Sequence, residues 1–254
     1  KQACLADAKK RVADYMAVAN RQFAKLPAQP LEVRAVEPFR EKTAGAVPFY
    51  QRGTPDGSRP GLVYFNLSDM SQVLKPQLPA LTYHEGAPGH HFQLSRQISQ
   101  TDLPPFRRFN NFTAYTEGWG LYAEGLAKEA GFYQDPIEEF GRLSLEIWRA
   151  VRLVLDTGIH ALRWSREQAV DYMRRNTLNS ERDIQGEIDR YFTNPGQATG
   201  YKIGQMKFLS LRQKAAKAKG SAYDIRDFHE TVLKDGALPL DMLEAQVDAY
   251  ISGK

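Results

Sequence analysis

The sequence predicts a mainly α-helical protein in which a small β element near residues 30–66 interrupts the helices. Apolar residues recur at helical spacing over residues 2–25, and helical patterns dominate almost everything beyond residue 78. Two helix-start signals support this, an Asp-Pro pair at 135–136 and a capping box at 165–168. No repeat or low-complexity linker divides the 254 residues, so we expect a single helical catalytic domain over residues 1–254.

Two short strands are expected within the β element. Residues 31–36 alternate apolar and polar side chains, and residues 62–66 form a short run rich in apolar and aromatic side chains. Residues 54–61 between them contain two prolines and two glycines and should form a loop. Further helices are expected to begin after Asp135, to span residues 165–176, and to cover residues 180–192, 201–219, 224–234 and 240–250.

The composition excludes several functional classes. The net charge of +4 is spread along the chain, and no run of Lys and Arg is interleaved with aromatic residues, so nucleic acid is not an expected partner. The single cysteine, Cys4, cannot form an intrachain disulfide and leaves the redox compartment open. No apolar run approaches the roughly 20 residues of a membrane-spanning helix, so no transmembrane segment is expected.

The most informative stretch is residues 84–91, with the sequence HEGAPGHH, which holds three of the five histidines. Zinc in hydrolases is bound by His nitrogens and carboxylate oxygens at about 2.0–2.2 Å, and one position is left for a water molecule. A neighbouring Glu takes a proton from that water as it attacks a carbonyl. The usual short solution, H-E-x-x-H, is absent here because residue 88 is proline.

A regular helix could not bring His84 to the same ion as either of the later histidines. His90 would lie about 120° around the helix from His84, and His91 would lie roughly 10.5 Å further along its axis. However, Pro88 removes a helical hydrogen bond, and the glycines on either side permit unusual backbone angles. A bulged or broken helix could therefore return one of the two histidines to the metal.

A third ligand is expected from another helix, ideally a carboxylate. Residues 115–124 offer Glu117 and Glu124, which are seven residues apart and therefore lie on one helix face. A Glu followed directly by Gly and Trp is unusual on a helix surface, because Gly weakens a helix and Trp favours burial. Both carboxylates are therefore candidates.

Residues 84–93 and 117–124 closely resemble a bacterial family known as domain of unknown function 885, whose members are described as metallopeptidases or lipoproteins. The resemblance continues in residues 56–61, 156–160 and 195–204, and thus covers nearly the whole chain. Family members are longer than this chain, and the sequence begins without Met. We therefore expect residues 1–254 to be the C-terminal half of a longer protein, with the N-terminal half as its partner.

The resemblance carries specific roles. The family pattern His-Glu-x-x-Pro-Gly-His places its two histidines at His84 and His90. The family is also similar to helical zinc carboxypeptidases and dipeptidases, in which two His and a downstream Glu hold Zn²⁺. This likeness implies Glu117 as the third ligand, Glu85 as the general base and a gluzincin-like helical metallopeptidase fold. Glu124 is then expected to support a ligand or form an ion pair.

Other residues are candidates for the remaining catalytic tasks. His160 follows Asp156 by four residues, and a pairing between them could orient the imidazole toward a substrate oxyanion. Tyr201, expected to open a helix after a Pro/Gly loop, could donate a hydrogen bond to the same oxyanion, a role that related helical peptidases give to a tyrosine. Interior packing is the alternative for both side chains. Candidates to bind the terminal carboxylate of a peptide are Arg163, Arg190 and Lys202.

We therefore expect a zinc-dependent hydrolase, a metallopeptidase of the carboxypeptidase or dipeptidase type that acts on a peptide or small amide through a zinc-bound water activated by Glu85. Hydrolysis of an ester or a non-peptide amide is the alternative within enzymes. A metal-binding scaffold or pseudoenzyme is the alternative outside them, and the intact Glu85 argues against it because metal binding alone does not require that residue. The lipoprotein description favours the cell envelope or periplasm over the cytoplasm.

Overall fold

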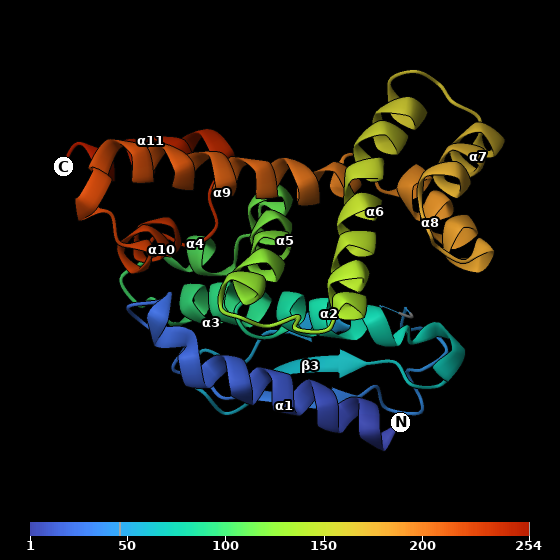
Figure 1. The fold of residues 1–254 in the computed structure, drawn as a ribbon, viewed down its shortest axis with the longest axis horizontal. Coiled ribbons are helices and arrows are strands. Elements are labelled where there is room, and N and C mark those ends of the chain that lie inside the picture. Colours follow the sequence, from blue (N-terminus) through green and yellow to red (C-terminus); the bar gives the residue numbers. More distant parts are fainter. Residues whose placement is uncertain (46, 254) are drawn as a thin grey trace.

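The computed structural model describes residues 1–45 and 47–253 and is mainly helical, as expected (Figure 1). The chain opens with α1 (Gln2–Val18), which continues into the 3-10 turn η1 (Ala19–Arg21). Two further 3-10 turns, η2 (Met70–Gln72) and η3 (Lys75–Gln77), precede the helical part. The other elements of that part are α2 (Leu78–Glu85), α3 (His90–Ser99), α4 (Pro105–Phe109), α5 (Thr113–Glu129), α6 (Pro136–His160), α7 (Arg166–Asn176), α8 (Glu181–Thr193), α9 (Gln197–Lys219), η4 (Gly220–Ala222), α10 (Ile225–Leu233) and α11 (Leu240–Ile251).

A three-stranded sheet forms the expected β element. Its order is β1-β3-β2, with β1 (Leu31–Ala35) parallel to β3 (Gly61–Phe65) and β2 (Phe49–Gln51) antiparallel to it. The two strands predicted from sequence are present. The prediction missed β2, because three residues are too few to show the alternation that marks a strand.

The elements are arranged in layers (Figure 1). The sheet and α1 lie on one side of α2 and α3, which follow one another end to end, and α5 and α6 stand between this layer and α9. The main hydrophobic core connects these layers, with Tyr15 of α1, Trp119 of α5 and Phe208 of α9 among its fully buried side chains. A smaller cluster around Leu62 and Tyr64 packs separately.

Helix starts follow the sequence signals, with one exception. Asp135 caps α6 by accepting from the Ile137 N–H, and Ser165 opens α7 with the expected capping box. The predicted start of α9 at residue 201 is wrong, because α9 begins at Gln197. The carboxylate of Asp156 accepts from the Gly196 N–H at 3.0–3.1 Å and satisfies a free donor at this helix terminus, so the helix begins one turn earlier.

Helices α5 and α9 cross with their backbones in contact. A Cβ atom added to Gly118 would lie 2.4 Å from the Cα of Gly204, and one added to Gly204 would lie 1.8 Å from the carbonyl oxygen of Ala114. Atoms cannot approach so closely without displacing one helix. Glycine at these positions therefore sets the distance between α5 and α9.

We predict that Gly204→Ala lowers the free energy of unfolding by about 1–3 kcal/mol, because the new methyl group overpacks a backbone contact. Gly125→Ala is the matched control on α5, where an added Cβ meets nothing within 4 Å. It should raise the free energy of unfolding by about 0.5–1 kcal/mol through the better helix propensity of Ala. Urea denaturation of both variants measures this, and equal effects would contradict the packing argument.

Candidate metal centre

The chain leaves the helical path between α2 and α3 and so brings together His84 and His90, which a regular helix would place on different faces. Helix α2 ends at Glu85, and α3 begins at His90 after a turn that contains the cis peptide bond Ala87-Pro88. Within this turn the Gly89 N–H donates to the Tyr83 carbonyl at 3.0 Å. The rings of His84 and His90 consequently lie 4.7 Å apart between their centroids. The broken helix expected from sequence is therefore present.

Glycines and a tryptophan stabilise this turn. A Cβ atom on Gly89 would lie 1.8 Å from the carbonyl oxygen of His84, so no other residue fits there. A Cβ atom on Gly120 of α5 would lie 2.6 Å from the His84 ring, which therefore occupies the space that a side chain would fill. The Trp119 indole N–H donates to the carbonyls of Pro88 and Gly89 at 3.0 and 3.1 Å and satisfies acceptors that the break leaves free.

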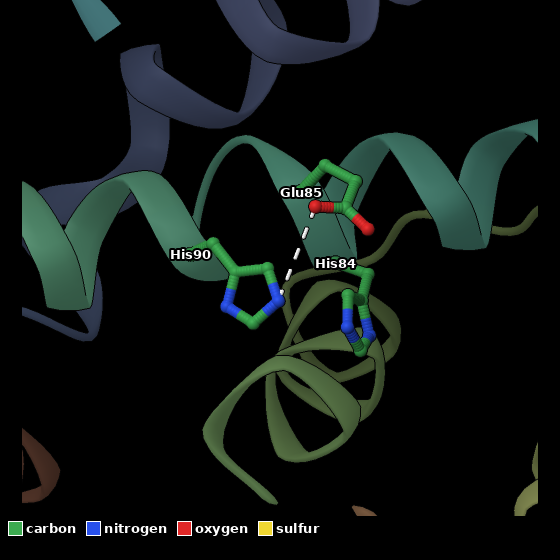
Figure 2. A group of neighbouring side chains, drawn as sticks. All are labelled: His84, Glu85 and His90. Atoms are coloured by element: carbon green, nitrogen blue, oxygen red, sulfur yellow. Dashed lines mark ion pairs between the residues drawn. The ribbon is translucent and has the colours of Figure 1, made fainter. Parts of the chain in front are cut away.

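Three candidate ligand atoms converge at this junction. The Oε2 atom of Glu117, on α5, lies 3.4 Å from Nε2 of His84 and 3.3 Å from Nε2 of His90. Glu85 is also close, with its Oε2 atom 3.9 Å from Nε2 of His90 (Figure 2). His84, Glu85 and His90 each offer an atom within 4.8 Å of the others. Both carboxylates therefore border the same space, and Glu117 contacts both histidines more closely.

The distances suit a metal ion. Two atoms bound at about 2.0–2.1 Å to one tetrahedral zinc ion lie roughly 3.3–3.4 Å apart. The two contacts of Glu117 have these lengths, and both are long for hydrogen bonds to a carboxylate. The residues therefore fit a zinc ion held by His84, His90 and Glu117, with Glu85 beside it.

The other side of His84 is held by a buried carboxylate. Its Nδ1 atom lies 2.8 Å from Oε1 of Glu124, and the same oxygen accepts from Nη2 of Arg149 at 3.3 Å. Glu124 is fully buried and Arg149 is nearly so. An Nδ1–H bonded to a carboxylate leaves Nε2 with its lone pair directed at the candidate ion, as is usual for metal-binding histidines. Glu124 thus forms an ion pair with Arg149 beside His84, one of the two roles expected for it from sequence.

The carboxylates around the site outnumber the arginine guanidinium that pairs with one of them. Glu85, Glu117 and Glu124 bring three carboxylates to a largely buried space, and Arg149 contacts one of them, Glu124. If all are ionised and the histidines are neutral, the group carries a net charge of −2. Buried charge must be compensated by pairing or by a metal ion. A divalent cation would neutralise the group.

Proton affinities reflect the same imbalance. Burial opposes protonation of His84, but Glu117, Glu124 and the charge of Glu85 outweigh it and raise the pKa of His84 to about 9. Burial would raise the pKa of Glu117, yet His90 and His84 hold it well below its usual range. Burial raises the pKa of Glu85 against the opposing effect of the two histidines. Of the two carboxylates beside His90, Glu85 therefore has the higher proton affinity.

Tyr201 lies beside the centre, on the first turns of α9. Its ring is 6.2 Å from the His84 ring and is tilted by only 24° from it. Gln197 donates to its hydroxyl at 3.3 Å. Burial, reinforced by the charge of Glu117, raises the pKa of Tyr201, so the hydroxyl keeps its proton and remains a donor. The structure thus brings the ring of Tyr201 close to that of His84.

His91 points away from the centre toward the sheet. Its Nδ1 atom lies 3.1 Å from the Tyr50 hydroxyl of β2, and it closely approaches Gly61 of β3. Burial lowers the pKa of His91 to about 4, so the ring is neutral. The structure therefore gives His90 and His91 different surroundings, with only His90 beside Glu117.

The expected pairing of His160 with Asp156 is wrong. His160 is exposed at the end of α6, where its Nε2 atom bonds to the Tyr191 carbonyl at 2.9 Å, while Asp156 caps α9. Helix α6 continues through Gly158 as required, but the two side chains have other partners. His160 also lies about 12 Å along the helix beyond Arg152, the α6 residue that contacts Tyr201. The structure does not bring His160 to the metal centre.

Two of the three candidate carboxylate-binding residues, Arg190 and Lys202, already have carboxylate partners. Arg190 binds Glu187 at 2.8–3.0 Å and donates to Gln197, the residue that contacts Tyr201. Lys202 binds Glu146 at 2.6 Å. The third candidate, Arg163, is exposed with a positive φ of 56° after the end of α6. Of these, Arg190 is connected to Tyr201 through Gln197.

The sequence analysis did not identify Arg149 and Arg152 of α6 as neighbours of the candidate centre. Arg149 contacts Glu124, and Arg152 stacks on the ring of Tyr201. Both are buried, which is unusual for arginine. The sequence offered one signal, since Arg149 and Arg152 lie on the same side of α6 as Leu145 and Trp148, where an amphipathic helix carries apolar residues.

The chain matches the bacterial family described as "bacterial protein of unknown function" (DUF885) over residues 1–247, and it belongs to that family. No curated protein matches the chain. The crystal structure of a putative lipoprotein from Colwellia psychrerythraea is 41% identical in sequence, with a TM-score of 0.96. A putative lipoprotein of unknown function from Shewanella oneidensis, 22% identical with a TM-score of 0.78, shares the fold.

These comparisons also show how the chain relates to longer proteins. The match to the Colwellia protein includes 100% of this chain and 43% of that protein. The match to the Shewanella protein includes 95% of this chain and 45% of that protein. Within residues 1–45 and 47–253, we find no helix whose length and apolar character would let it cross a membrane.

We predict that zinc binding displaces a proton from His84. With a pKa of about 9, the metal-free ring is protonated at pH 7.5 and must lose one proton to bind an ion. Calorimetric titration with Zn²⁺ in buffers of different ionisation enthalpy should show proton release at pH 7.5 that includes the proton of His84. Glu124→Gln should reduce the release at pH 7.5, because it removes a carboxylate that raises this pKa.

Stability should follow the same proton. The folded-state pKa of His84 exceeds the ordinary value of 6.5, so its protonation stabilises the metal-free fold below pH 6.5. That contribution is lost as the pH rises toward 9. The melting temperature of the metal-free protein should therefore fall between pH 6.5 and 9, and should fall less in Glu124→Gln. The same pH dependence in the wild type and in Glu124→Gln would contradict the raised pKa of His84.

Proposed function

We propose that this chain carries the catalytic centre of a zinc-dependent hydrolase, a metallopeptidase of the carboxypeptidase or dipeptidase type with a gluzincin-like arrangement. The observation that carries the proposal is the contact of Glu117 Oε2 with Nε2 of both His84 and His90, at 3.4 and 3.3 Å, beside a further buried carboxylate, Glu85. Two histidines and a carboxylate with an adjacent Glu form the donor set of hydrolytic zinc sites.

The residues divide the work as follows. A zinc ion held by His84, His90 and Glu117 would supply a Lewis acid that polarises the substrate carbonyl and the attacking water. Glu85 does not need to bind the ion, and its raised pKa fits a group that takes the proton from the attacking water and passes it to the leaving amine. The Tyr201 hydroxyl, which keeps its proton and belongs to a ring near that of His84, would donate a hydrogen bond to the oxyanion.

The substrate in this proposal is a peptide or a small amide. A terminal carboxylate would be bound by Arg190 or Lys202, in competition with Glu187 and Glu146, their present partners. Because the chain spans less than half of the Colwellia and Shewanella proteins, additional residues like theirs would complete the substrate cleft. The description of those proteins as putative lipoproteins supports a location in the cell envelope.

We predict that His84→Ala, His90→Ala and Glu117→Ala each sharply lower the bound zinc, because each removes one donor from the set. His91→Ala is the matched control, since it removes a neighbouring imidazole that faces Tyr50 and the sheet. That variant should keep its zinc and lose stability instead. Metal analysis of the dialysed proteins measures this, and loss of zinc from His91→Ala but not from His90→Ala would reverse the assignment.

We predict that Glu85→Gln retains zinc and fold while kcat falls by about 10²–10⁴-fold, because the amide keeps the size of the side chain but cannot accept the proton. Tyr201→Phe should lower kcat less, by about 10–10³-fold, through the loss of one hydrogen bond to the oxyanion. Digestion of a synthetic peptide library, followed by mass spectrometry, identifies a substrate for both assays.

The same assays separate the alternatives. Unchanged turnover in Glu85→Gln would exclude the proposed mechanism. If the protein binds zinc but cleaves no peptide, ester and non-peptide amide libraries are tested next. Cleavage there would indicate an esterase or amidase, and no cleavage would indicate a metal-binding scaffold without activity.

A further inference from the structure

Arg152, in the middle of α6, is buried in a network that connects α6 to α8. Its Nε atom donates to the Tyr191 hydroxyl at 2.9 Å, and its Nη2 atom donates to Glu187 at 3.0 Å. The Tyr191 hydroxyl in turn donates to Glu187 at 2.7 Å and accepts from the Trp148 indole at 3.2 Å. The guanidinium is thus fixed in position by α8.

This guanidinium also lies over the ring of Tyr201. The Cζ atom of Arg152 is 4.5 Å from the centroid of the Tyr201 ring and 4.8 Å from that of Trp148. Arg152 is only 5% exposed, and a cation–π contact is strongest where water is excluded. The ring of His84, at the candidate metal centre, lies 6.2 Å from that of Tyr201 between their centroids. Tyr201 therefore connects the α6–α8 network to the candidate metal centre.

The contacts of Tyr201 otherwise leave its hydroxyl loosely held. Among the residues that the structure describes, the hydroxyl has one hydrogen bond, a long contact of 3.3 Å from Gln197. A tyrosine ring can rotate about its side-chain bonds unless its faces are packed. The stacked guanidinium supplies that packing on α6, and the planar fork of arginine makes it possible to stack and to bind Glu187 at once.

We propose that Arg152 is a positioning residue that fixes the Tyr201 ring beside His84 and so sets where the Tyr201 hydroxyl can donate. The catalytic meaning of this inference rests on the function proposed above, whereas the contact itself does not. Helix α8 therefore affects the position of Tyr201 through Arg152, which binds Tyr191 and Glu187 of α8. Lysine in place of Arg152 would keep the charge but could not stack and bind both partners.

The first experiment reads the position of Tyr201 without any reaction. Fluorotyrosine labelling of the 12 tyrosines gives a fluorine NMR spectrum, in which Tyr201 is identified by the signal that Tyr201→Phe removes. Arg152→Lys and the double variant Arg152→Gln/Glu187→Gln should shift or broaden that signal. The double variant leaves no unpaired buried carboxylate. It therefore still tests the inference if Arg152→Lys does not fold.

The matched control is Arg212→Lys on α9. Arg212 also binds a carboxylate, Glu129 at 2.8 Å, and its Cζ atom lies 6.0 Å from the ring of another tyrosine, Tyr122. The same substitution there should leave the Tyr201 signal in place. A Tyr201 signal unchanged in both Arg152 variants, or equally changed in Arg212→Lys, overturns the inference.

The second experiment is a double-mutant cycle on the peptide best cleaved in the library. Arg152→Lys should lower kcat/KM by about 10–10²-fold in the wild type, because a misplaced catalytic group costs that much. In the Tyr201→Phe background the same change should cost about 2-fold or less, since the hydroxyl it positions is gone. Zinc content should stay unchanged in all four proteins. Equal losses in both backgrounds overturn the positioning role.

The two experiments keep the inference separate from the proposed function. If no peptide is cleaved, the proposed function fails, and the fluorine spectrum alone decides whether Arg152 holds Tyr201. If peptides are cleaved but the cycle is additive, the proposed function stands and the positioning role fails.

Discussion

The close packing of α5 between α2 and α9 is the constraint on which the arrangement of the centre depends. Gly118 lets the backbone of α9 touch α5, and Gly120 gives room to the ring of His84. Between them, Trp119 donates to the carbonyls of the turn after α2. Side chains at either glycine position would push apart the helices that carry Glu117, His84 and Tyr201.

This packing explains how a disrupted motif can still form a compact donor set. The turn at residues 86–89 shortens the path from His84 to His90, and α5 then presents Glu117 to both rings. About two turns further along α5, Glu124 contacts Nδ1 on the other side of the His84 ring. A single helix thus supplies both the carboxylate between the histidines and the carboxylate that fixes the tautomer of His84.

The interior around the candidate metal centre also contains an unusual number of charged side chains. The centre brings together more carboxylates than cations, and a proton on His84 compensates part of the excess when no metal is bound. Further along α6, buried arginines pair with Glu124 and Glu187. Burying so many ionised groups is costly unless each is paired, and their gathering around one junction of the helices is typical of a functional site.

The sequence by itself determined the helical class, the two longer strands, the caps at Asp135 and Ser165 and the identity of the candidate donors, because these depend on local periodicity and residue chemistry. Only the tertiary structure decided the rest. The partners of Asp156 and His160 depended on α8 and α9, and the burial of Arg149 and Arg152 depended on neighbours distant in sequence. Residue spacing limits which side chains can share a helix face, whereas long-range packing decides which of them meet.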